Sequence, residues 1–108
     1  MRHLFVDITF PDKETAARIA KTLVEERLAA CANILPGMES IYWWNGAVEQ
    51  AAECACICKT SDAAYPALEA RVRELHPYDT PCVTALPLER GSEAFLRWIE
   101  EETQPKQG

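Results

Sequence analysis

The chain has 108 residues, of which 48% are hydrophobic and 26% are charged, and its formal net charge is −6. A chain of this length forms one hydrophobic core, so we expect a single domain over residues 1–103 and a flexible tail at 104–108. The excess of acidic side chains argues against nucleic acid as a partner, because a phosphate backbone would be repelled. No stretch approaches the roughly 20 apolar residues of a membrane span, which argues against a membrane protein.

Five cysteines and the amino-terminal residues bear on the cellular compartment. An odd number of cysteines does not fit the paired framework of a small secreted domain, and reduced thiols are typical of the cytosol. Residues 1–7 run directly into alternating apolar and polar side chains, without the apolar segment of a signal peptide. The sequence therefore predicts a cytoplasmic protein.

The first two predicted elements are a strand and a helix. Residues 4–10 place apolar side chains at every second position, which predicts a strand that Pro11 ends. From Lys13 to Leu28 the apolar spacing becomes that of an amphipathic helix, and Asp12 is a suitable N-cap. The predicted apolar stripe of this helix comprises Ala16, Ala17, Ala20, Leu23, Val24 and Leu28.

A long hairpin is predicted next. Residues 29–35 have the composition of a buried strand, Pro36 and Gly37 are expected to bend or bulge it, and residues 38–44 continue it. Asn45–Gly46 is a strong hairpin signal, because a type I′ turn needs positive φ at both central positions. The return strand is predicted over residues 47–60.

The last third of the chain predicts a helix, a strand and a short helix. Ser61 or Asp62 is the expected cap of the first of these helices, which should end before Pro77. A strand is expected over residues 81–88, and Ser92 is the expected cap of the final helix. The apolar side of that helix comprises Phe95, Leu96, Trp98 and Ile99.

The order βαββαβ with a terminal helix predicts an α+β fold, a ferredoxin-like sandwich with helices on one face of an antiparallel sheet. The 15 residues from Ala30 to Trp44 would span ~50 Å at about 3.4 Å each. A compact chain of this length is only about 34 Å across, so the hairpin must project.

The projecting tip carries four large side chains, Ile41, Tyr42, Trp43 and Trp44. They would leave an apolar patch and unpaired strand edges in water. Stacking on a ligand is one possible role for the two tryptophans, but burial by another subunit needs fewer assumptions. A closed ring of identical chains is the expected assembly, because each hairpin can pair with a neighbour's edge.

Three thiols on the return strand, Cys54, Cys56 and Cys58, form one candidate metal or redox site. Neighbouring side chains on one strand face are roughly 7 Å apart, whereas tetrahedral zinc needs sulfur atoms about 3.7 Å apart. Packing as small apolar groups is therefore the favoured interpretation, and metal binding stays open.

His76 is the other candidate, at the end of the second predicted helix. A histidine beside a thiol or a carboxylate can bind a transition metal, and Cys31 and Asp79 are the candidate companions. A structural histidine bonded to the backbone is an equally good interpretation. Cys31 itself lies among small residues, as in a tightly packed strand.

Four separated motifs resemble the CutA family of divalent-cation tolerance proteins, and the likeness runs from about Leu4 to Thr103. The motifs are Glu26-Arg27-Leu28-Ala29-Ala30-Cys31-Ala32-Asn33-Ile34-Leu35-Pro36-Gly37, Ser40-Ile41-Tyr42-Trp43-Trp44-Asn45-Gly46, Lys59-Thr60, and Glu74-Leu75-His76-Pro77-Tyr78-Asp79-Thr80-Pro81.

The resemblance implies a cytoplasmic homotrimer, held together through the hairpin tips, that binds copper or another divalent metal and contributes to copper tolerance. The positions that match the family's copper ligands hold Ile8, Leu75 and His76 here, so His76 is the one shared donor. Metal is not expected to be needed for folding.

Two other functions are weighed against this one. The family's architecture is similar to that of PII signalling proteins, so the alternative is a regulatory trimer that binds a small ligand or a protein in clefts between subunits. An enzyme is not expected, because the sequence has no Ser-His-Asp set and no glycine-rich phosphate loop.

Overall fold

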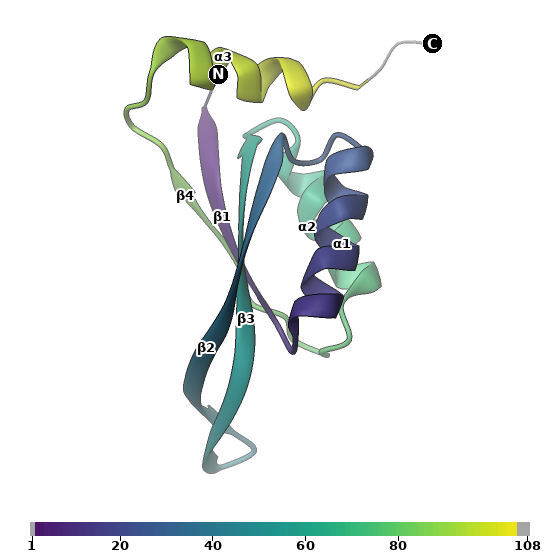
Figure 1. The fold of residues 1–108 in the computed structure, drawn as a ribbon, viewed down its shortest axis with the longest axis vertical. Helices are drawn as coiled ribbons and strands as arrows, with labels where there is room; N and C mark the ends of the chain where they lie inside the picture. Colours follow the sequence, from purple (N-terminus) through teal and green to yellow (C-terminus); the bar gives the residue numbers. More distant parts are fainter. Residues whose placement is uncertain (1, 106–108) are drawn as a thin grey trace.

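The computed structural model describes residues 2–105, and it shows one four-stranded antiparallel sheet with two helices on one face and a third helix across one end (Figure 1). The elements are β1 (His3–Phe10), α1 (Lys13–Glu25), β2 (Cys31–Trp44), β3 (Ala47–Ser61), α2 (Tyr65–Leu75), β4 (Val83–Pro87) and α3 (Glu93–Glu102). The strand order is β2-β3-β1-β4. The expected ferredoxin-like α+β order with a terminal helix is confirmed.

The core lies between the sheet and helices α1 and α2. On β1 the alternating residues Leu4, Val6, Ile8 and Phe10 are all buried, as the period-2 pattern predicts. β1 lies between β3 and β4, so both of its edges are hydrogen bonded. The other buried side chains of this core come mainly from β3, α1 and α2, and comprise Cys54, Cys56, Cys58, Ala16, Ile19, Ala20, Leu23, Ala29, Leu68 and Val72.

Helix α1 begins as predicted and ends earlier than predicted. The Asp12 carboxylate accepts a hydrogen bond from the backbone N–H of Thr15 at 2.7 Å, which caps the first turn. Arg27 adopts a positive φ of 62°, which stops the helix before Leu28. The predicted apolar stripe omitted Ile19, which is fully buried, and wrongly included the exposed Ala17 and the partly exposed Val24.

The cap predicted for the second helix is corrected. The N-cap position is Ala64, without a side-chain hydrogen bond, and Pro66 lies in the first turn. Ser61 instead ends β3, where its hydroxyl accepts a hydrogen bond from the backbone N–H of Ala64. The helix ends at Leu75, before Pro77, as predicted.

Helix α3 begins after Ser92, whose side chain accepts from the backbone N–H of Phe95, as predicted. Of its apolar residues only Ile99 is buried, while Phe95 and Trp98 stack on each other and remain partly exposed. The Thr103 hydroxyl donates to Ser61, so the chain is anchored up to that residue. Of the predicted tail, residues 106–108 lie outside the described residues.

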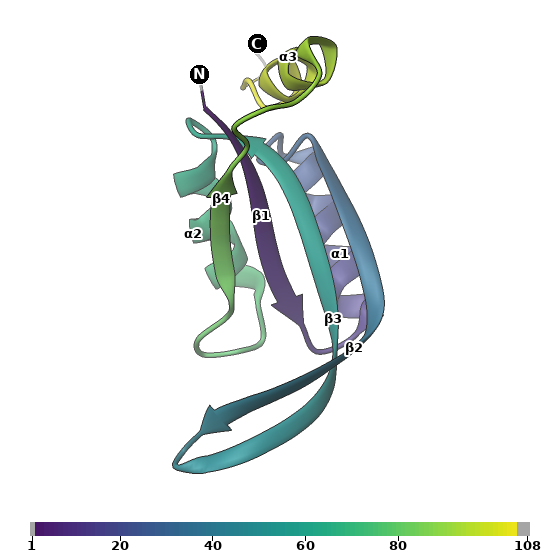
Figure 2. The same cartoon turned by 90° about the vertical axis from the view of Figure 1, so that its left-hand side faces the viewer.

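The hairpin projects from the sheet, as its length predicted, and the molecule measures 46 × 31 × 22 Å. Asn45 and Gly46 have φ values of 50° and 79°, which fits the predicted turn. The register of β2 against β3 shifts between Leu35 and Met38, where Gly37 has a φ of 85°. The half of the hairpin beyond this bulge bends beneath the loop between α2 and β4 (Figure 2).

On the second face of the sheet, which is turned to the viewer in Figure 2, α3 covers one end, where Glu100 and Thr103 contact His3 and Ser61, and no other helix of residues 2–105 covers the rest. The strand registers place on this face the half-buried or exposed residues Phe5, Asp7, Thr9, Cys31, Asn33, Leu35, Ala55, Ile57, Lys59, Thr84 and Leu86. We call it the bare face. β4 on one side of the sheet and β2 on the other are edge strands.

Candidate functional site

A cleft of about 470 Å³ lies where the hairpin bends beneath the α2–β4 loop. Four elements supply its walls: β1, β2, β3 and the loop that follows α2. The lining residues are Thr9, Ser40, Tyr42, Trp44, Glu53, Tyr78, Asp79, Thr80 and Cys82. We call it the hairpin cleft.

A hydrogen bond between Tyr78 and Glu53 closes the inner end of the hairpin cleft. The Tyr78 phenol donates to Glu53 Oε2 at 2.5 Å, and only 8% of Glu53 is exposed. Burial and the Glu53 carboxylate both raise the pKa of the Tyr78 phenol well above its usual value, so the phenol stays protonated and remains a donor. This bond joins the α2–β4 loop to the base of the bent hairpin.

His76 lies behind this bond, and both of its ring nitrogens are engaged. Nε2 donates to the carbonyl oxygen of Thr9 at 2.7 Å, and Nδ1 accepts from the backbone N–H of Tyr78 at 3.1 Å. The ring stacks on Phe10 with centroids 4.9 Å apart and is 7% exposed. These contacts fix the start of the α2–β4 loop, and they leave no nitrogen of His76 free to bind a metal.

The structure does not bring the three predicted metal donors together. Asp79 is exposed and lines the hairpin cleft, whereas His76 is buried and is not one of the residues that line it. Cys31 pairs with Lys59, whereas Thr9, which holds His76, pairs with Ala55. Those two positions on β3 are separated by roughly 13 Å at about 3.3 Å per residue, so Cys31 and His76 cannot share one ion.

The three thiols of β3 are buried beneath α1 and α2, and one expectation about them was wrong. The sulfur atoms of Cys56 and Cys58 are 3.9 Å apart, not the roughly 7 Å that strand spacing suggested. Strand geometry fixes the spacing of the Cα atoms, but the side chains are free to lean toward each other. Their hydrogen bond and burial raise the pKa of the Cys58 thiol, which disfavours the thiolate that a metal requires.

Among residues 2–105, no group of three or more histidine, cysteine, aspartate or glutamate side chains is placed to hold a metal ion. Taken as one chain, the described residues therefore do not fit a resident metal. Within the same range, no helix has the length and apolar character needed to cross a membrane.

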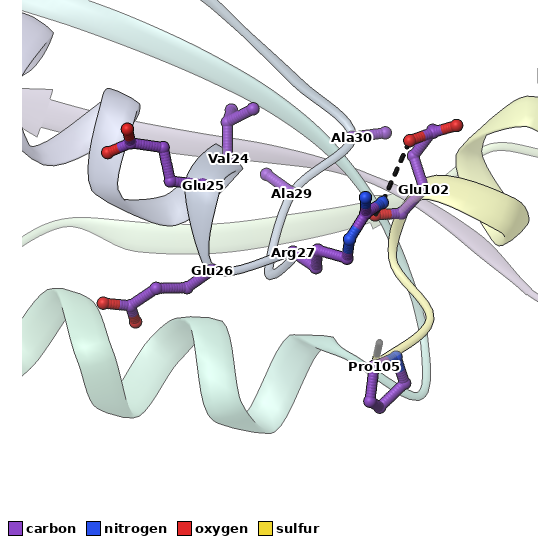
Figure 3. Close-up of a pocket in the computed structure, with 8 residues that line it drawn as sticks. All are labelled: Val24, Glu25, Glu26, Arg27, Ala29, Ala30, Glu102 and Pro105. Carbon is purple, nitrogen blue, oxygen red and sulfur yellow. Dashed lines mark hydrogen bonds and ion pairs between the residues drawn. The ribbon is translucent and has the colours of Figure 1, made fainter. Parts of the chain in front are cut away.

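A second cavity, of about 500 Å³, lies between the end of α1 and the end of α3 (Figure 3). Arg27 reaches across it, and its guanidinium donates to the Glu102 carboxylate at 3.0 Å and to the Glu102 carbonyl at 3.3 Å. The nearby Glu26 pairs with Arg71. Arg27, the one cation among the lining residues, is therefore engaged by Glu102, and no thiol lines the cavity.

The four large residues at the hairpin tip divide between the two faces of the hairpin. Tyr42 and Trp44 lie on the same face of β2 as Ser40, and all three line the hairpin cleft. Ile41 and Trp43 point to the other face and are 69% and 74% exposed. The sequence predicts one interface for all four residues. In the structure, one pair lines the hairpin cleft and the other pair is exposed on the opposite face of the hairpin.

Comparison with known proteins places this arrangement in a family. The family model described as "CutA1 divalent ion tolerance protein" matches residues 4–102. The chain belongs to the CutA1 family. The resemblance noted in the sequence is therefore confirmed.

Relatives and solved structures agree over nearly the whole chain. The divalent-cation tolerance protein CutA of Thermus thermophilus is 50% identical over 96 residues, covering 89% of this chain and 93% of the relative. The structure of that organism's protein superimposes with a TM-score of 0.92 at 48% identity, covering 94% of this chain and 99% of the other. CutA1 from Oryza sativa superimposes with a TM-score of 0.93 at 41% identity, covering 96% of this chain and 95% of the other.

Sequence reasoning missed the inner end of the hairpin cleft. The sequence patterns considered above predict no functional role for Tyr78, which appears only within the fourth motif, and they do not include Glu53. One signal was available in the sequence. Glu53 directly precedes the apolar segment that begins at Cys54, and a charged residue at the edge of a buried segment usually has a bonding partner.

Proposed function

We propose that this chain acts as a homotrimer in divalent-cation tolerance and that the assembled trimer binds a divalent metal such as Cu(II). Membership of a family described by divalent ion tolerance carries the proposal. The five free cysteines favour a reducing cytoplasm as its location, although the Archaeoglobus fulgidus relative is described as periplasmic. The Thermus thermophilus and Archaeoglobus fulgidus relatives are described as tolerance proteins, and these descriptions name no reaction.

Three features of the single chain support a ring of subunits. The bare face carries Leu86 at 64% exposure and Leu35 at 47%, and the outer face of the hairpin adds Ile41 and Trp43. Exposed apolar surface of this extent marks a contact with another chain. The two free edges, β2 and β4, allow a head-to-tail contact, and such a contact leaves no free edge when a rotation closes the ring.

The mass of the particle in solution tests the assembly. Light scattering during size-exclusion chromatography should give about 36 kDa, three times the 12.1 kDa of one chain. Replacing the exposed hairpin residue with a charged one, Trp43→Asp, should lower that mass. Ala17→Asp, on an exposed position of α1, should leave it unchanged. A wild-type mass of one chain at micromolar concentration would contradict the trimer.

Metal binding requires donors from more than one chain, because one described chain has no group of three. Asp79, with its exposed carboxylate, is the candidate donor that we retain, and the hydrogen bonds of His76 support a structural role. Calorimetric titration of the reduced trimer with Cu(II) should show binding that Asp79→Asn weakens. His76→Ala should lower stability and leave Cu(II) affinity unchanged, and loss of Cu(II) binding in that variant would instead make His76 a ligand.

The regulatory alternative, a PII-like trimer, rests on similarity of architecture, and none of the relatives named above is described as a signalling protein.

A further inference from the structure

The hairpin cleft has the wrong charge for an anion. Two carboxylates, Glu53 and Asp79, are among its lining residues, and no lysine, arginine or histidine is. Its remaining polar groups include the hydroxyls of Thr9, Ser40 and Thr80, which can accept hydrogen bonds. The lining therefore favours a ligand that carries positive charge and hydrogen-bond donors.

The Glu53 carboxylate has one oxygen available to such a ligand. Oε2 accepts from Tyr78, and no other side chain of residues 2–105 donates to this carboxylate. Every buried side-chain oxygen in the described part of the chain has a hydrogen-bond partner. Oε1, for which no partner is found among these residues, is therefore not fully enclosed and can accept a further hydrogen bond, although only 8% of the whole residue is exposed. An N–H group of a bound ligand would donate a hydrogen bond to Oε1, and a hydrogen bond between an ammonium group and a carboxylate is strong because both partners are charged.

Aromatic side chains form much of the rest of the lining. Tyr42 and Trp44 come from the bent hairpin, and Tyr78 comes from the opposite loop. A cation over the face of a tryptophan or tyrosine ring is attracted by the negative face of the ring. Hydrated metal ions gain little from such walls, and the described residues offer no three metal donors here. An organic cation uses both the rings and the carboxylate.

We propose that the hairpin cleft binds a small organic ammonium ion, held by Glu53 and by the rings of Tyr42, Trp44 and Tyr78. Its volume of about 470 Å³ lies in the range of small-molecule sites. This inference goes beyond divalent-cation tolerance, and it depends neither on a metal nor on the number of subunits.

The test compares three probes of nearly the same shape and different charge: benzylammonium, benzyl alcohol and benzoate. Calorimetric titration of the wild-type protein at pH 7 should show binding of benzylammonium. Benzyl alcohol should bind at least about tenfold more weakly, because it lacks the positive charge that attracts the ammonium ion to the carboxylate and to the aromatic rings. Benzoate should not bind. Equal affinity for the alcohol and the ammonium ion would overturn the proposal.

Two variants with the same change of net charge locate the ion. Glu53→Gln should lower benzylammonium affinity at least about tenfold, in line with the loss of a charged acceptor. Glu39→Gln, an exposed residue of the same hairpin that contacts Gln50, should leave the affinity unchanged. Equal losses in the two variants would show only general charge attraction and would overturn the site.

A further variant keeps the test decisive if Glu53→Gln does not fold. Trp44→Leu changes a half-exposed hairpin residue, and it should weaken benzylammonium binding while benzyl alcohol binding changes less. Absence of benzylammonium binding to the wild-type protein would refute the proposal. If Glu53→Gln then also gave a smaller particle, a basic side chain of a neighbouring copy would be the occupant of the cleft.

Discussion

The phenol of Tyr78 donates a 2.5 Å hydrogen bond to the carboxylate of Glu53, which lies 25 residues earlier in the chain. Tyr78 follows α2, and Glu53 lies on β3 where the hairpin begins to bend away from the sheet. The bond therefore holds the projecting hairpin against the body of the domain. Because Oε2 accepts this bond, Oε1 is the oxygen of Glu53 that has no hydrogen-bond partner among residues 2–105.

Removing the phenol oxygen should destabilise the fold. In Tyr78→Phe the nearly buried Glu53 carboxylate loses its donor, and a buried group left without its partner costs about 1–3 kcal/mol. Urea unfolding at one fixed protein concentration measures this, because the stability of an oligomer depends on concentration. Tyr65→Phe is the matched control, since no hydrogen bond of the Tyr65 phenol is found within residues 2–105, and it should change stability by less than about 0.5 kcal/mol. Equal stability of wild type and Tyr78→Phe would show that the bond contributes nothing.

The same phenol should make the protein sensitive to alkali. Burial and Glu53 raise the pKa of Tyr78 in the folded state, whereas in the unfolded chain it titrates near pH 10. Above about pH 10 the unfolded state binds fewer protons than the folded state, so the free energy of unfolding falls as pH rises. Below pH 10 this contribution is fully present.

Unfolding curves between pH 9 and pH 11.5 check this dependence. The wild type should lose stability with pH more steeply than Tyr78→Phe, which lacks the ionising group. The other tyrosines, the lysines and the thiols titrate in both proteins, so the difference isolates Tyr78. Parallel curves for the two proteins would be the contradicting result.

Local signals predicted most of the fold, because they depend on the backbone alone. Asn45–Gly46 fixed the position of the hairpin turn, since both residues adopt positive φ. The alternation along β1 predicted which side chains are buried, and Asp12 and Ser92 cap their helices as expected. Each of these features involves residues that are close in sequence.

Features that depend on distant contacts could not be predicted in the same way. The engagement of His76 needs the carbonyl of Thr9, 67 residues away, and the burial of Glu53 needs Tyr78. The approach of the Cys56 and Cys58 sulfur atoms depends on side-chain rotamers, which strand spacing does not determine. Helical spacing alone also failed to distinguish the buried Ile19 from the exposed Ala17.

The bulge in β2 provides a test of backbone strain. Gly37 has a φ of 85°, and a Cβ atom added there would meet nothing within 4 Å, so any cost comes from the backbone and not from a clash. Gly37→Ala should destabilise the protein by roughly 1–2 kcal/mol, the cost of the left-handed region for an ordinary residue. Gly37→Asn should cost less, because asparagine tolerates that region better. Thermal unfolding of both variants at one concentration measures the difference, and an alanine variant as stable as the asparagine variant would argue that the bulge adopts another conformation.

The buried thiols of β3 should not contribute to metal binding. The sulfur atoms of Cys56 and Cys58 are 3.9 Å apart, close to the ~3.7 Å that tetrahedral zinc requires, so distance alone does not exclude them. Protonation argues against Cys54 and Cys58, since burial raises the pKa of the Cys54 thiol, and the hydrogen bond that Cys58 shares with Cys56, together with burial, raises the pKa of Cys58. The same bond lowers the pKa of Cys56, so only one of the three thiols favours the thiolate that a metal requires. Both thiols also lie in the packed core beneath α1 and α2, where an ion would have to displace apolar side chains.

Replacing Cys54, Cys56 and Cys58 together with alanine should therefore leave the amount of Cu(II) or Zn(II) bound per chain unchanged. The protein should also unfold more easily, because three buried side chains become smaller. Equilibrium dialysis of the reduced proteins followed by metal analysis measures the stoichiometry. Cys82→Ala, which removes the exposed thiol of the hairpin cleft, is a useful comparison. Loss of a bound ion from the triple variant, with Cys82→Ala unaffected, would show that the core opens and that the thiols of β3 are ligands.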